Sequence, residues 1–145
     1  MNNNQSTLNS LATTTFDSVR GYRKAAEIAD NPQLSQQLEQ RANSREQTLG
    51  TLNAELSRLG CEQVNEQSFS GQAHQMFASI SDAFENGDEA AAERVEEGED
   101  YIAGQFRDAL DGSDLEGSSR QVVEQAYQEI QSGEQFGDRI ENQYD

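Results

Sequence analysis

Apolar residues recur at alternating steps of three and four along this chain, which is the period of a helix that buries one face. The clearest stripe comprises Leu38, Ala42, Leu49, Leu52, Leu56 and Leu59. Similar stripes predict five helices, over about residues 6–30, 32–59, 69–86, 89–111 and 115–143. Strong helix formers dominate and Val and Ile are scarce, so strands are not expected. The predicted fold class is therefore all-α.

The expected helix boundaries carry cap and turn residues. Asn31 and Pro32 are typical of an N-cap followed by the first helical position. Asp88 is the expected N-cap of the fourth helix. Gly133 and Gly137 lie inside the last predicted helix, where they favour a bend or fraying.

The lengths of the connections predict how the helices pair. Tight turns join the first two long helices and the last two, so each pair should form an antiparallel hairpin. Residues 60–87 join the hairpins and are long enough to run the length of a bundle. This pattern predicts a ferritin-like four-helix bundle with an extra short helix in the long crossover, and a simple up-down array of five helices is the alternative. We expect one domain over residues 6–145, after a disordered N-terminus over residues 1–5.

Charge is unevenly distributed over the chain, whose formal net charge is −17. Residues 82–145 hold nineteen acids and four bases. Such a surface repels nucleic acid and anionic lipid, so neither nucleic acid nor a membrane is an expected partner. The acids serve solubility or salt adaptation in one interpretation, and form a face for cations or a basic partner in the other. A homo-oligomer or a protein partner stays open.

The compartment is inferred from what the sequence lacks. Cys61 is the only cysteine, so it cannot form an intramolecular disulfide. The first residues have neither the basic nor the apolar region of a secretory signal. No apolar run approaches the roughly 20 residues that span a bilayer. We therefore expect a cytoplasmic protein.

A standard di-iron site is excluded by the histidine count. Such sites in ferritin-like bundles take a Glu from each of two helices and a Glu-x-x-His pair from each of the other two. His74 is the only histidine, it lies in the predicted crossover helix, and Gly71 stands three residues before it. The sequence shows no arrangement for nucleophilic catalysis either, because His74 is the only histidine that could serve Cys61 as a base. We expect no enzyme activity and no cofactor.

An all-carboxylate metal site is the remaining chemical hypothesis. Glu99 and Glu129 lie on the inner stripes of the last two predicted helices, and Glu46 and Asp17 lie near the inner edges of the first two. The alternative is that each is a boundary residue, either solvated or paired with an arginine (Arg20, Arg23 or Arg45). Arg45 itself interrupts an apolar stripe and is expected to snorkel at the bundle edge.

Four short segments, in this order, resemble a known family. They are Asp17-Ser-Val-Arg-Gly-Tyr-Arg-Lys-Ala-Ala-Glu27, the helix end from Glu55 to Gly60, Gly71-Gln-Ala-His74, and Glu96-Glu-Gly-Glu-Asp100. The chain resembles, over about residues 7–142, a bacterial family of small ferritin-like four-helix-bundle proteins known only as a domain of unknown function.

The resemblance implies a bacterial protein with a link to stress responses and no established activity. Glu99 matches the acidic position of the family's Gly-Glu-Asp motif, and is the best single site candidate on that ground. The family often has a His-Asp pair in the last helix, where this chain has Gly137-Asp138. That departure weakens any metal-binding role that the resemblance would transfer to this chain.

These observations together predict a small acidic bundle that is not an enzyme. We expect it to be associated with stress and to act by binding or assembly. The alternative is a divergent ferritin-like protein that binds metal through carboxylates.

Overall fold

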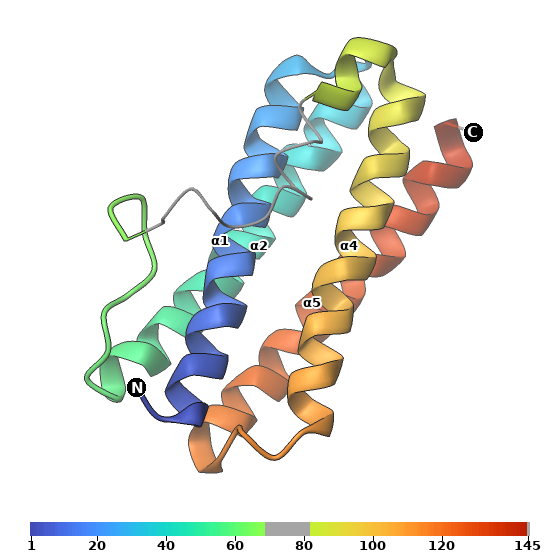
Figure 1. Cartoon of the computed structure of the whole chain (residues 1–145). Coiled ribbons are helices and arrows are strands. Elements are labelled where there is room, and N and C mark those ends of the chain that lie inside the picture. Colours follow the sequence, from blue (N-terminus) through green and yellow to red (C-terminus); the bar gives the residue numbers. More distant parts are fainter. Residues whose placement is uncertain (69–81, 145) are drawn as a thin grey trace.

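Four long helices make up the protein, in a computed structural model that describes residues 1–68 and 82–144. They are α1 (Asn3–Ile28), α2 (Pro32–Arg58), α4 (Asp88–Asp111) and α5 (Gly117–Tyr144), and a short 3-10 helix η1 (Phe84–Asn86) precedes α4 (Figure 1). Within these ranges there is no strand. The all-α fold class is confirmed, and the long helices fall within a few residues of their predicted bounds. Most of the short helix predicted over residues 69–86 lies outside the described residues.

The first helix begins earlier than the sequence pattern predicts. Asn2 accepts a hydrogen bond from the backbone N–H of Gln5, and the Gln5 side chain accepts one from the backbone N–H of Asn2. This reciprocal capping box satisfies two N–H groups that a helix start leaves open. Residues 3–5 are therefore helical and not disordered. The prediction missed this start because Asn and Gln carry no apolar period.

Contacts between the helix ends fix the direction of the helices. At one end of the bundle, Asn4 near the start of α1 donates to the hydroxyl of Ser119 near the start of α5, at 3.0 Å. At the other end, the backbone N–H of Asn31, just before α2, donates to Asp88 at the start of α4, at 2.9 Å. α2 and α4 therefore run in the same direction, as Figure 1 shows. The expected parallel course of these two helices is confirmed.

The core lies between two antiparallel hairpins, α1–α2 and α4–α5, and packing is densest within each hairpin. Side chains from all four helices fill it, including Leu8, Tyr22, Leu38, Leu52, Ile102, Phe106 and Ile130. Tyr22 and Phe136 join the hairpins through an edge-to-face ring contact with centroids 6.4 Å apart. None of the described helices is long and apolar enough to cross a bilayer.

Two local expectations were wrong. Asp88 is the first residue of α4 and not its N-cap, which is Gly87 with φ 101°. The Asp88 carboxylate instead accepts from the backbone N–H groups of Asp30 and Asn31, so it fastens the second hairpin to the turn of the first. α5 also continues as one helix through Gly133 and Gly137 to Tyr144. A Cβ atom on Gly137 would lie 3.1 Å from the Cα atom of Glu96, so this glycine lets the backbone of α4 pass close by.

Candidate functional site

An arginine occupies the centre of the bundle. The Arg45 side chain is fully buried, and its guanidinium makes two parallel hydrogen bonds to Glu99, from Nη1 to Oε1 at 2.9 Å and from Nη2 to Oε2 at 2.8 Å. Glu99 is itself fully buried. The expectation that Arg45 snorkels at the bundle edge was wrong. Its head group lies inside because a carboxylate on the opposite hairpin meets it there with bidentate geometry.

A second carboxylate completes the cluster. Arg45 Nε donates to Glu129 Oε1 at 2.8 Å, and the hydroxyl of Thr48 donates to the same oxygen at 2.8 Å. Arg41 donates to the other carboxylate oxygen of Glu129. Two arginines of α2 thus face one glutamate from α4 and one from α5. The formal charges of this central ion network (Arg41, Arg45, Glu99 and Glu129) cancel.

The first helix closes the network from the remaining side. Ser18 accepts from Arg45 Nη1 at 3.1 Å, and the Tyr22 ring lies 5.8 Å from the guanidinium carbon. Burial and the negative charge of Glu99 raise the pKa of Tyr22 well above its usual range. Burial alone disfavours the Arg45 cation, but Glu99 and Glu129 outweigh it and raise the pKa of Arg45. Both arginine and tyrosine therefore keep their protons.

The last helix leaves room for this network at one position. A Cβ atom on Gly133 would lie 1.8 Å from Glu99 Oε2 and 2.3 Å from Arg45 Nη2. Glycine at this position therefore lets the backbone of α5 pass directly beside the ion pair. Four helices, each with its own part, build the network: a hydroxyl and a ring from α1, arginines from α2, and glutamates from α4 and α5.

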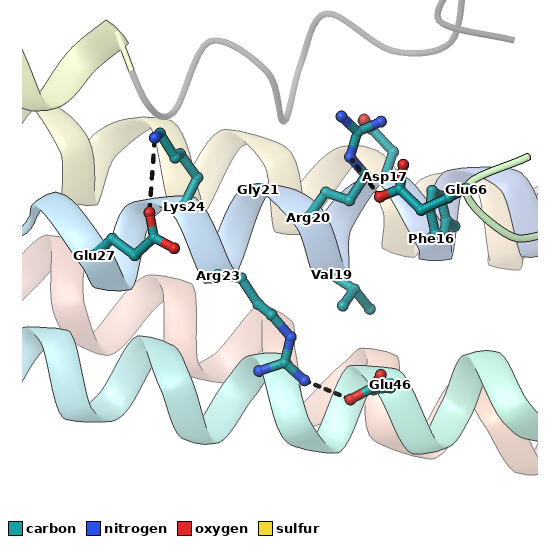
Figure 2. A pocket seen from close by; sticks show the side chains of 10 residues that line it. All are labelled: Phe16, Asp17, Val19, Arg20, Gly21, Arg23, Lys24, Glu27, Glu46 and Glu66. Carbon is teal, nitrogen blue, oxygen red and sulfur yellow. Dashed lines mark hydrogen bonds and ion pairs between the residues drawn. The ribbon is translucent and has the colours of Figure 1, made fainter. Parts of the chain in front are cut away.

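The four carboxylates predicted from the sequence do not converge on one point. Glu99 and Glu129 share Arg45, as the arginine-pairing alternative proposed. Glu46 is exposed and pairs with Arg23 of α1. Asp17 is buried on α1, and lines a cavity together with Glu46 (Figure 2). His74 lies outside the described residues, and Cys61 is a half-buried free thiol.

A different group of acids comes together on the outer face of the second hairpin. Glu96 and Asp100 of α4 and Asp138 of α5 each offer a carboxylate oxygen, and these oxygens lie within 4.8 Å of one another. A hydrogen bond with Asp100, partial burial, and the charges of Asp100 and Glu141 raise the pKa of Glu96 to about 8. Like charges therefore repel each other in this outer acid group (Glu96, Asp100 and Asp138), whereas the charges of the central ion network cancel.

The interior network offers no open position for chemistry. Its glutamates are held by arginines, and an arginine does not act as a base because it keeps its proton at all ordinary pH values. A metal ion at Glu99 and Glu129 would have to displace Arg45, whose three nitrogens are engaged in charge-assisted hydrogen bonds. The sequence signals for this network were Arg45, which interrupts the apolar stripe of the second helix, and the inward positions of Glu99 and Glu129.

The fold and the interior define a class: an all-α four-helix bundle whose two hairpins meet across a buried arginine–glutamate network. Within this class, residues 3–112 match the family described as a domain of unknown function (DUF2383), and the chain belongs to that family. Glu99, Arg45 and α1 lie inside the matched residues, while Glu129 and Gly133 lie beyond them. No curated protein and no solved structure matches the chain.

Proposed function

We propose that this protein is a ferritin-like bundle of a bacterial cytoplasm that is not an enzyme, is associated with stress, and acts by binding or assembly. The support for ferritin-like connectivity is the parallel course of α2 and α4, which requires a long crossover. The bacterial origin and the link to stress follow from the family resemblance of the sequence.

The central ion network is the observation that carries this proposal. Metal chemistry in a four-helix bundle uses inward carboxylates with open coordination positions. Here the two inward glutamates, Glu99 and Glu129, are already neutralised by Arg45 and Arg41. Such an interior holds the hairpins in one register, and leaves recognition to the surface.

The surface favours a partner with positive charge. Nineteen of the 27 acids lie within residues 82–145, which include all of α4 and α5. Among the residues that the structure describes, no arginine forms an ion pair with the outer acid group, whereas arginines neutralise the glutamates of the interior. A basic segment of a protein partner, or of a neighbouring copy of the chain, would relieve that repulsion, and electrostatic attraction of this kind accelerates encounter.

Two measurements on the purified protein test this function. Metal analysis after purification without chelators or added metal should give less than one iron, manganese or zinc per chain. Light scattering and titration with a lysine-rich peptide should reveal self-association or binding that weakens as sodium chloride increases. A triple variant with Glu96→Gln, Asp100→Asn and Asp138→Asn should bind the peptide more weakly than the wild type.

The alternative, a carboxylate metal protein, has a distinct signature in the same experiments. One or two metal ions per chain that Glu99→Gln abolishes would overturn the proposal and place the function in the interior. Metal that the outer triple variant abolishes would overturn it as well, and would place the function on the surface. Unchanged peptide binding by the triple variant would remove the role given to the outer acid group.

A further inference from the structure

A small pocket of about 250 Å³ lies between α2 and α5. Its volume is just below the roughly 300–1,000 Å³ of sites that take drug-sized ligands, so it suits a ligand of a few heavy atoms. The side chains that line it include two cations and no acid: Gln37, Gln40, Arg41 and Ser44 from α2, and Phe136 and Arg139 from α5. In a chain whose formal net charge is −17, this lining is a local exception.

Arg41 is already fixed in place by the protein itself. Its Nη2 atom donates to Glu129, and its guanidinium carbon lies 5.9 Å from the centre of the Phe136 ring. The side chain of Arg41 keeps 16% of its surface exposed. Its Nη1 atom has no hydrogen-bond partner within residues 1–68 and 82–144 and, unlike its Nε atom, is not closed off from solvent. Arg41 therefore offers a donor whose position is set by contacts that a ligand need not break.

Arg139 supplies the excess charge of the pocket. It is exposed and forms no ion pair with any residue whose placement the structure describes. No acid stands three or four positions from it along α5, and Asp138, its neighbour in sequence, belongs to the outer acid group with α4. Two cations line the pocket, and the charge of Arg41 cancels within the central ion network, so one positive charge remains, at Arg139.

We propose that this pocket binds a small carboxylate, whose oxygens accept hydrogen bonds from Arg41 and Arg139. The planar guanidinium group matches the two oxygens of a carboxylate. Gln40 and Ser44 make no side-chain hydrogen bond to the other described residues, so each has a further donor for the same ligand. One negative charge balances the single excess charge of the pocket, whereas a phosphate dianion would bring a second charge close to Glu129. An ammonium group would meet two cations and no acid.

The test uses butanoate as the probe, with n-butanol and n-butylammonium as matched neutral and cationic probes and inorganic phosphate as the competing anion. At pH 7 and constant ionic strength, titration of ¹⁵N-labelled protein with butanoate should shift the amide resonances of residues 37–44 and 135–140 in a saturable way. Arg139→Gln should weaken butanoate binding about tenfold, as expected for the loss of a charged hydrogen-bond donor. Arg94→Gln removes one exposed cation from α4 and serves as the charge-matched control, which should leave the affinity unchanged.

Several outcomes would overturn this proposal. They are butanol or butylammonium binding as tightly as butanoate, phosphate binding more tightly than butanoate, unchanged affinity in the Arg139→Gln protein, or no saturable shift at all. Equal weakening by Arg139→Gln and Arg94→Gln would overturn it too, because butanoate would then respond only to the overall charge of the chain. If Arg139→Gln does not give a dispersed spectrum, Arg139→Lys takes its place: it keeps the charge without the planar fork, and should also weaken butanoate binding.

Discussion

At the scale of single residues, the burial of Arg45 depends on its pairing with buried acceptors. Taking a guanidinium and two carboxylates out of water is costly, and the attraction among them repays that cost only when the geometry is good and further hydrogen bonds are made. Arg45 meets this condition with four hydrogen bonds, to Glu99, Glu129 and Ser18. A network of this kind is weak support for stability in itself, but removal of one member leaves an unpaired buried charge.

Removing the central cation should therefore be severe. Arg45→Ala should lower the free energy of unfolding by roughly 3–5 kcal/mol, because Glu99 then remains buried without a counter-charge. The double variant Arg45→Met with Glu99→Leu should recover most of that loss, since no uncompensated charge stays at that position. Urea denaturation followed by circular dichroism measures both. Equal loss in the single and double variants would show that packing, and not charge, is what Arg45 contributes.

Gly133 offers a sharper test because the same substitution can be made at another helical glycine, Gly50, as a control. Gly133→Ala should destabilise the protein by roughly 2–4 kcal/mol, as the new Cβ would overlap Glu99 and force the ion pair apart. Gly50→Ala is the matched control on α2, where a Cβ meets nothing within 4 Å. That variant should gain about 0.5–1 kcal/mol from helix propensity. If both substitutions stabilise, α5 does not approach the network as closely as the structure indicates.

The pKa of Asp17 predicts a loss of stability toward high pH. The folded protein holds this proton more tightly than the unfolded chain, in which the ordinary value is 3.8, against about 7 in the fold. Stability is then fully present below about pH 4 and falls as the pH rises toward 7. Asp17→Asn should flatten this decline in melting temperature between pH 5 and 8. A decline that persists unchanged in the variant would assign it to other groups, of which Glu96 is the first candidate.

At the scale of elements, Glu55 connects two helix ends. It lies in the last turn of α2, accepts two hydrogen bonds from Arg58 and accepts from the hydroxyls of Ser118 and Ser119 in the first turn of α5. These donors, with Arg58 first, lower the pKa of Glu55 to about 2. The carboxylate is therefore the link between α2 and α5 at the end of the bundle where α1 begins.

This link predicts that the protein loses stability as the pH falls into the acid range. A carboxylate with a lowered pKa stabilises the fold above its unfolded value of 4.5, and that contribution is lost as the pH falls toward 2. Melting temperatures between pH 5 and 2.5 should fall less steeply for Glu55→Gln than for the wild type. The variant should also be less stable at pH 6. Parallel curves would show that Glu55 gains nothing from the serines and Arg58.

At the scale of the whole molecule, charge is divided between a neutral interior and a strongly acidic exterior. Acids at i, i+3 and i+4 on α4, such as Glu89 with Glu93 and Glu93 with Glu97, repel each other by about 0.2–0.5 kcal/mol a pair. The outer acid group adds repulsion between α4 and α5. Self-repulsion of this kind opposes the compact state and is open to screening by salt.

Sodium chloride should therefore raise the melting temperature. The Debye length falls from about 30 Å at 0.01 M to about 3 Å at 1 M, so exposed acids repel each other less while the buried network is little affected. The triple variant Glu96→Gln, Asp100→Asn and Asp138→Asn should gain less over the same range. A flat or falling melting temperature would mean that the acids are already compensated by bound cations, which would favour the metal-binding alternative.

The sequence alone determined the helices and their connections, because period and cap chemistry are local properties of the chain. The tight turn at Asn31 and Pro32 was visible there, as was the long segment that makes α2 and α4 parallel. Glu99 and Glu129 could be placed on inner stripes for the same reason. The start of α1 was missed, because polar capping residues replace the apolar signal there, and the N-cap of α4 was placed one residue too late.

Only the tertiary structure decided what those inner carboxylates do. Glu99 comes from α4, Arg45 from α2 and Gly133 from α5, and each looked like an exception within its own helix. When the hairpins pack, the charge of Arg45 is neutralised by Glu99, and Gly133 leaves room for this ion pair. Burial and pairing depend on neighbours that are distant in sequence, so a periodic pattern gives the position of a charged side chain but not its partner.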